Sequence, residues 1–173
     1  MNKTSNKGVI INSDDDVRVV LRNFFGQAME KQTFDAVLMP MKVPSGDSYA
    51  WILIKDRDFL SDANPIAPIM PINAAVALKK LTRKGSGKLN IAVVMRPCEI
   101  RAAIELTKLN QINLDKITLL SYDCAGALPM QDYIADPAKN EKIFNEIISD
   151  DIWNSKDVKP VCKICDKFAL CNL

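Results

Sequence analysis

Residues 91–124 read IAVVMRPCEIRAAIELTKLNQINLDKITLLSYDC. They begin with a continuous apolar run, Ile91 to Met95, of the kind found in strands that are buried on both faces. Apolar positions from Glu99 to about Asn110 follow a helical period, and the run from Ile117 to Tyr122 predicts another buried strand. Strand, helix and strand make a βαβ unit, in which the crossover is nearly always right-handed and the two strands are parallel.

A cysteine follows each of the two predicted strands. Cys98 lies three residues beyond the first strand and Cys124 two residues beyond the second, so both thiols are expected at the carboxyl edge of the sheet. Neighbouring strands are about 4.8 Å apart, which lets two such sulfur atoms reach one cluster. Open α/β sheets bind their ligands at this edge. The following helix begins near Cys98, where its dipole favours a thiolate, and Arg96 adds positive charge there.

A Cys-x-x-Cys pair, Cys162 and Cys165, supplies two more sulfur atoms. The chain has five cysteines and no histidine, which excludes Cys/His zinc sites and histidine-based catalysis. In a reducing compartment such cysteines are more often ligands or reactive thiols than disulfides. We therefore predict that Cys98, Cys124, Cys162 and Cys165 hold an iron-sulfur cluster. Cys171 is either a non-ligating thiol or an alternate ligand.

Three other interpretations of these cysteines stay open. A structural zinc site uses the same four thiolates, although such sites usually show two close pairs and this chain has one. A thioredoxin-like dithiol follows a strand and opens a helix, whereas this pair follows Pro160 near the end of the chain. In the third interpretation Cys98 and Cys124 are small buried apolar residues without a ligand role. Their neighbours Asp123 and Gly126 are typical of loops, which argues against burial in the core.

The rest of the chain predicts elements that surround the βαβ unit. We expect a single domain over residues 1–173, with an α/β fold: a βαβ-containing, mostly parallel or mixed sheet flanked by helices, with an N-terminal helix and β-hairpin. The expected elements are a helix from Asp14 to about Lys31, a hairpin of residues 34–43 and 49–54, a proline-rich loop at 64–71, a helix at 73–84 and a helix at 138–149.

The charge and composition of the chain limit the kinds of partner that we expect it to bind. The formal net charge is +2 and the lysines are scattered among acidic residues, so nucleic acid is not expected as a partner. No apolar run approaches the roughly 20 residues that cross a bilayer, and no signal-peptide region follows Met1. We expect a cytoplasmic protein without a membrane partner.

Several of these motifs together resemble one known family. They are Met95 to Ala102 (MRPCEIRA), Asp123-Cys124, Cys162 to Asp166 (CKICD), Asp35 to Pro44 with the following Ser-Gly-Asp, and Pro68 to Asn73. The combination resembles the β subunit family of coenzyme F420 hydrogenases and dehydrogenases, which includes relatives associated with formate dehydrogenase and heterodisulfide reductase. The likeness covers most of this chain and only the N-terminal half of the family.

The resemblance implies an iron-sulfur flavoprotein subunit of a multi-subunit oxidoreductase. In that family FAD exchanges a hydride with coenzyme F420 or a similar carrier, and a 4Fe-4S cluster passes electrons to partner subunits. Cys98, Cys124, Cys162 and Cys165 carry over as cluster ligands, and Arg96 is expected near the cluster or the flavin. Family members continue well past the Cys-x-x-Cys pair, so we expect a fragment or a split or shortened subunit. The alternative function is a non-enzymatic interaction domain that is stabilised by a structural zinc site with four cysteine ligands.

Overall fold

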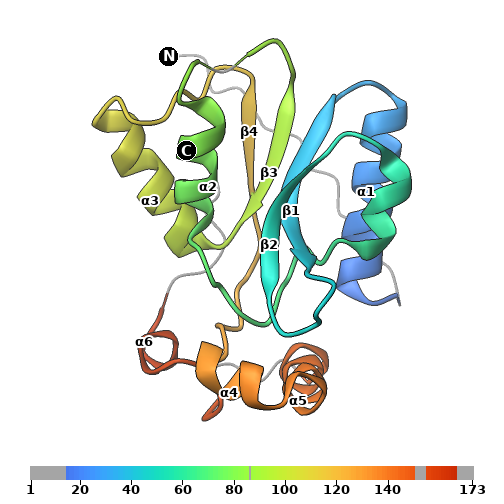
Figure 1. Cartoon of the computed structure of the whole chain (residues 1–173), viewed down its shortest axis with the longest axis vertical. Helices are drawn as coiled ribbons and strands as arrows, with labels where there is room; N and C mark the ends of the chain where they lie inside the picture. The colour runs from blue at the N-terminus through green and yellow to red at the C-terminus, as the bar shows by residue number, and fades with distance from the viewer. Residues whose placement is uncertain (1–14, 86, 151–154, 167–173) are drawn as a thin grey trace, which may run out of the picture.

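A mixed sheet of four strands lies at the centre of the fold (Figure 1). The computed structural model describes residues 15–85, 87–150 and 155–166. Its strands are β1 (Ala36–Lys42), β2 (Tyr49–Ile54), β3 (Ile91–Met95) and β4 (Ile117–Ser121). They are ordered β2-β1-β3-β4, with β1, β3 and β4 parallel and β2 antiparallel to β1. The predicted hairpin, βαβ unit and mixed sheet are confirmed.

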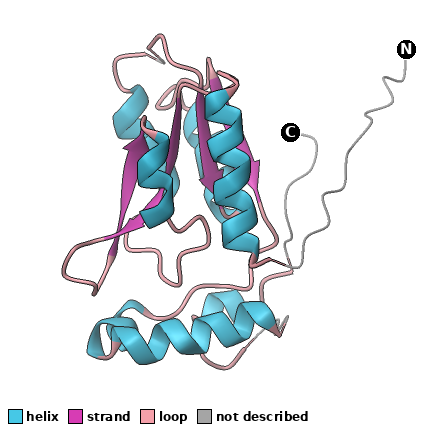
Figure 2. Cartoon of the chain, turned by 90° about the vertical axis from the view of Figure 1, so that its right-hand side faces the viewer, coloured by secondary structure: helices cyan, strands magenta, loops and turns pink. Residues whose placement is uncertain are grey.

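Helices cover both faces of the sheet and also its carboxyl edge (Figure 1, Figure 2). One face carries α2 and α3, and the other carries α1 and the short 3-10 helix η1. A third layer, α4 to α6, lies beyond the carboxyl ends of the strands. The bounds are Val17–Glu30 for α1, Arg57–Asp62 for η1, Ala74–Thr82 for α2, Pro97–Lys108 for α3, Met130–Ala135 for α4, Pro137–Ser149 for α5 and Pro160–Lys163 for α6.

The predicted helices form where local signals place them. The side chain of Asp16 accepts a hydrogen bond from the amide of Arg18 at the start of α1, and that of Asn73 accepts from Ala75 at the start of α2. The predicted N-terminal helix was expected to begin at Asp14, which lies outside the described part. The sequence did not predict η1, α4 or α6, which are short. No helix in the described ranges is long and apolar enough to cross a membrane.

Strand β3 is buried along its whole length, as its apolar run predicted. The same prediction for β4 was wrong, because β4 is the edge strand of the sheet and is only partly buried. Ile91, Val93 and Met95 pack toward α2 and α3, whereas Ala92 and Val94 pack toward α1. This alternation follows from the two-residue period of a strand. The central strand is therefore anchored in two apolar layers, and its carboxyl end is a rigid platform for the residues that follow.

The proline-rich loop closes over the carboxyl end of β1. Strand β1 pairs with β3 only as far as Leu38, so Pro40 lies beyond that ladder and its missing N–H leaves no gap in it. The carbonyl of Pro40 accepts a hydrogen bond from the amide of Asn64 at 2.8 Å. Further along the loop, the carbonyl of Pro68 accepts from the amide of Leu128 at 2.8 Å. The loop thus joins the sheet to the segment that precedes α4.

A polar contact, which we call the Glu141 clasp, fastens α5 to the sheet. Glu141 Oε1 accepts hydrogen bonds from the hydroxyls of Tyr49 and Tyr133, both at 2.6 Å, and Lys42 Nζ lies 3.2 Å from the same atom. Burial opposes the charge of Glu141, but the three donors outweigh that effect and hold its pKa below the usual value. The clasp ties α4 and α5 to β1 and β2.

We expect Glu141→Gln to lower the free energy of unfolding by about 1–2 kcal/mol at neutral pH, because neutral hydrogen bonds replace charge-assisted ones at a half-buried site. A depressed pKa contributes stability above the unfolded pKa and loses it as the pH falls through the folded one. The difference between the two proteins should therefore shrink from about pH 6 toward pH 3. Urea unfolding over this range measures it.

Glu146→Gln is the matched control, since Glu146 lies on the same helix and is exposed. It should change stability by less than about 0.5 kcal/mol at every pH. Equal losses in the two variants would show that the clasp contributes nothing specific.

Candidate iron-sulfur site

Cys98 lies in the first turn of α3, directly beyond the buried strand β3. The helix begins at Pro97, two residues earlier than predicted, because proline suits the first helical position. Glu99 caps this turn: its carboxylate accepts hydrogen bonds from the amide of Arg96 at 3.0 Å and from the amide of Ala74 at 2.8 Å. One buried carboxylate therefore joins the N-termini of α2 and α3 and fixes the position of Cys98.

Cys124 and Cys162 are brought together across Gly126. The amide of Gly126 donates to Cys124 Sγ at 3.4 Å. Gly126 has a φ of +107°, and a Cβ placed on it would lie 3.0 Å from Val158 Cγ1 and 3.2 Å from Cys162 Cβ. Only glycine combines this backbone conformation with so close an approach. The loop after β4 and the α6 segment can meet because residue 126 has no side chain.

A backbone hydrogen bond holds α6 at this point. The amide of Lys159 donates to the carbonyl of Ala127 at 2.8 Å, immediately before α6 begins. The amide of Cys165 donates to the carbonyl of Cys162 at 3.2 Å, which closes a turn over the Cys-x-x-Cys pair. Cys162 is half-buried and Cys165 is exposed. The pair thus presents one thiol toward the sheet edge and one on the surface.

Three of the thiols lie within electrostatic range of one another. Burial raises the pKa of Cys98, and Glu99, Cys124 and Cys162 raise it further. Burial likewise raises the pKa of Cys124, with a contribution from Cys162, whereas Arg96 lowers it. Thiols that raise one another's pKa are typical of a site that needs a cation or a metal to become anionic.

Arg96 lies beside these thiols and is almost completely buried, with 3% of its surface exposed. Its guanidinium donates to the carbonyl of Ala67, and Nη1 lies 3.8 Å from Glu99 Oε2. Burial opposes its charge, but Tyr122, Glu99 and the nearby thiols together hold its pKa above the usual value. Its Nε is buried and has no hydrogen-bond partner. The sequence placed Arg96 at this edge but did not indicate its burial.

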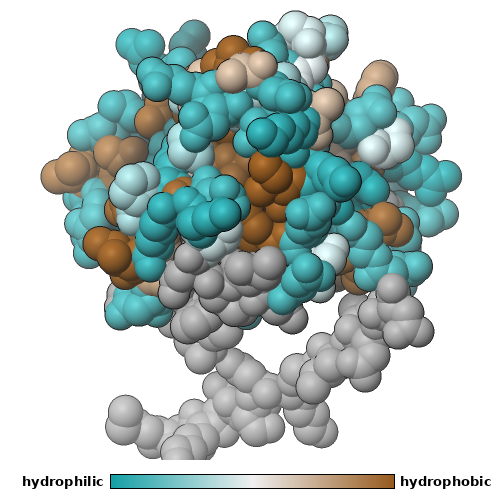
Figure 3. Space-filling view, turned by 90° about the horizontal axis from the view of Figure 1, so that it is seen from below, coloured by the Kyte–Doolittle hydropathy of each residue, from teal (hydrophilic) through white to brown (hydrophobic). Residues whose placement is uncertain are grey.

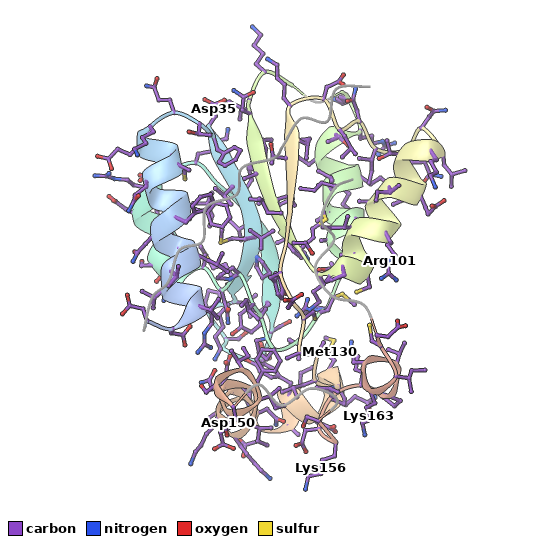
Figure 4. The ribbon with its side chains drawn as sticks, turned by 180° about the vertical axis from the view of Figure 1, so that it is seen from behind. Asp35, Arg101, Met130, Asp150, Lys156 and Lys163 are labelled. Atoms are coloured by element: carbon purple, nitrogen blue, oxygen red, sulfur yellow. The ribbon has the colours of Figure 1, made fainter. Side chains whose placement is uncertain are left out.

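Four thiols are the ligand set both of a structural zinc site and of a 4Fe-4S cluster. Within residues 15–85, 87–150 and 155–166, no three Cys, Asp or Glu side chains stand close enough to hold one metal ion. A zinc site needs all its thiolates about 2.3 Å from one atom, whereas an iron-sulfur cluster spreads its ligands over several irons. Thiol donors around a buried guanidinium fit an anionic cluster. Figure 4 shows side chains that carry sulfur between the labelled Arg101, Met130 and Lys163.

Sequence reasoning missed two residues that build this site, Glu99 and Gly126. Glu99 stands three residues after the helix cap, which is the spacing of a capping box, and this signal was available. Gly126 follows a cysteine after a predicted strand, but nothing local reveals that Val158 and Cys162 pack on it. Cys171 lies outside the described residues.

Three comparisons place the chain among known proteins. No family model matches it. It is 31% identical over 108 residues to the F420-dependent formate dehydrogenase 1 subunit beta of Methanococcus maripaludis, a match that covers 61% of this chain and 26% of the relative. It is 43% identical over 49 residues to the F420-dependent formate dehydrogenase subunit beta of Methanocaldococcus jannaschii, covering 28% of this chain and 13% of that relative.

A solved structure shares the fold. A chain of the F420-reducing NiFe hydrogenase complex from Methanosarcina barkeri matches with a TM-score of 0.51 and 18% identity, over 69% of this chain and 43% of the other. The chain therefore spans about a quarter or less of the curated relatives and under half of the hydrogenase chain. These matches confirm that the chain resembles, over part of its length, the β subunits of F420-dependent formate dehydrogenases, and that it shares the fold of a chain from the F420-reducing hydrogenase complex.

Proposed function

We propose that this chain is the cluster-binding part of a β-type subunit in a multi-subunit oxidoreductase, and that Cys98, Cys124, Cys162 and Cys165 hold a 4Fe-4S cluster. The observation that carries the proposal is the meeting of thiols from two separate layers beside one buried guanidinium. The partial similarity to dehydrogenase β subunits supports the reaction class. When bound, the cluster would accept and release single electrons.

The residues around the thiols provide the environment that such a cluster needs. Four thiolates and an iron-sulfur core make a net anion, which is costly to bury without compensating charge. Arg96 supplies a fixed positive charge, and the N-terminus of α3 adds its dipole beside Cys98. Gly126 donates its amide to Cys124, and such donors also stabilise anionic sulfur.

A surface beside Cys165 suits the exit of electrons to a partner subunit. Val161 and Ile164 in the α6 segment are 67% and 83% exposed, although both are apolar. Apolar side chains also gather near the middle of the lower face, which Figure 3 shows from below. Exposed apolar residues next to a redox centre favour contact with another protein. We propose that the other subunits of the redox complex dock here.

Coenzyme F420 enters the proposal through the relatives, whose names describe F420-dependent enzymes, whereas FAD enters it only through the family resemblance of the sequence motifs. A hollow of about 740 Å³ lies beside Tyr122, but Asp15, Asp16 and Asp123 line it. None of the described residues that line this hollow is a lysine or arginine that could bind the diphosphate of FAD, so we do not assign the flavin to it. We propose that FAD binds elsewhere in the oxidoreductase complex, together with the hydride carrier with which it reacts.

The proposal predicts iron and acid-labile sulfide in equal amounts, about four of each per chain, in anaerobically purified protein. Cys98→Ser and Cys124→Ser should each remove most of the iron and the visible absorption, because a ligand set of four thiolates loses one member. Iron, sulfide, zinc and flavin analysis alongside the visible spectrum measures this.

Cys171→Ser is the matched control, since it removes a thiol outside the proposed ligand set, and it should keep the full cluster. A complete cluster in both ligand variants would refute the ligand assignment. Stoichiometric zinc without iron or sulfide would instead support the alternative function, an interaction domain stabilised by a structural zinc site.

A second prediction concerns Gly126. Gly126→Ala should sharply reduce cluster content, because the new Cβ would force Val158 and Cys162 away from Cys124. Gly85→Ala is the matched control: Gly85 has a φ of +100°, but nothing lies within 4 Å of its Cβ position. Backbone strain should lower the free energy of unfolding of both variants by about 1–2 kcal/mol. Only Gly126→Ala should also lose iron. Equal iron contents would show that the close approach does not matter for cluster assembly.

A further inference from the structure

Among the described residues, the buried side-chain atoms that lack a hydrogen-bond partner belong to residues close in sequence to Cys98 and Cys124. In the part of the chain that the structure describes, three buried side-chain atoms lack a hydrogen-bond partner: Arg96 Nε, Arg101 Nη2 and Ser121 Oγ. Each belongs to a residue within three positions of Cys98 or Cys124. A buried donor without an acceptor costs about 1–3 kcal/mol, and folded proteins retain few of them. Three at one site indicate an acceptor that the protein alone does not supply.

Arg101 is positioned to reach the site from α3. It lies three residues after Cys98, which is close to one helical turn. Helical side chains lean toward the N-terminus, so Arg101 covers the turn that contains Cys98. In Figure 4 the labelled Arg101 and Lys163 stand on either side of side chains that carry sulfur. Lys163 is the neighbour of Cys162 in α6.

Ser121 approaches the same space from the sheet. It is the last residue of β4 and pairs in register with Met95, the last residue of β3. Side chains alternate along a strand, so Ser121 shares a face with Leu119, which packs against the core beneath α2 and α3. Ser121, at the end of β4, and Arg101, in the second turn of α3, therefore both lie near the edge of the sheet at which the cysteines emerge.

Sulfur is the acceptor that fits these donors. A cluster held by four thiolates is a net anion, and its inorganic and cysteine sulfur atoms accept hydrogen bonds. Donors and positive charge stabilise the reduced cluster more than the oxidised one, because reduction adds negative charge. Hydrogen bonds to sulfur are accordingly among the features that set cluster potentials.

We propose that Arg101 and Ser121 donate hydrogen bonds to sulfur atoms of the cluster or of its cysteine ligands and thereby raise its reduction potential. The inference rests on the proposed function, since it requires the cluster. It assigns a role to two residues outside the ligand set. It also provides a hydrogen-bond acceptor for the buried Nη2 of Arg101 and Oγ of Ser121.

The test is an anaerobic redox titration of the cluster in the full chain, followed by electron paramagnetic resonance. Arg101→Gln should favour the oxidised cluster by tenfold or more, which corresponds to a potential about 59 mV lower for one electron. Ser121→Ala should shift the potential in the same direction by less, because it removes a donor but no charge. Arg101→Lys, which keeps the charge and loses the planar donor set, should fall between Arg101→Gln and the unmodified protein.

Arg83→Gln is the matched control, since Arg83 is exposed at the end of α2 and its loss changes the net charge equally. Its potential should equal that of the unmodified protein. A loaded cluster whose potential is unchanged in Arg101→Gln and Ser121→Ala would overturn this inference and leave the proposed function intact. An unmodified protein that assembles no cluster would overturn both.

Discussion

The carboxylate of Glu99 is the contact on which the carboxyl edge of the sheet depends. It is 1% exposed, accepts the amides that open α2 and α3, and faces the buried guanidinium of Arg96. Without it, Arg96 would be a buried cation without its carboxylate partner, and breaking such a pair costs several kcal/mol. Two helix N-termini would also each lose an acceptor. The position of Cys98 therefore rests on an interaction that contains no cysteine.

The site is composite, because its thiols belong to two layers of the fold. Cys98 and Cys124 follow parallel strands of the sheet, whereas Cys162 and Cys165 belong to the helical layer beyond its edge. The Glu141 clasp fixes that layer to β1 and β2, and Gly126 lets its α6 segment approach Cys124. Changes remote from the sulfur atoms can therefore alter cluster binding by moving one layer against the other.

The proposed cluster would add negative charge beside two arginines. Arg96 brings a buried positive charge that has one carboxylate partner, and Arg101 brings an unpaired donor close by. Burial raises the pKa of the Cys98 and Cys124 thiols. Metal binding would convert them to thiolates and supply the negative charge that these cations face. The same balance explains why the cysteines and the arginines share one edge of the sheet.

Local sequence determined the elements and the edge at which the thiols emerge. The apolar runs of β3 and β4 specify parallel strands, although only β3 is buried. Asp16 and Asn73 specify helix starts, and Cys98 and Cys124 follow the strands at once. Each of these signals lies within a few residues of its effect, as periodicity and capping require. Tertiary structure alone decided that Arg96 is buried, that Val158 and Cys162 pack on Gly126, and that Glu141 meets Tyr49. These contacts join residues tens of positions apart, and their energies depend on burial and distance, which no local pattern encodes.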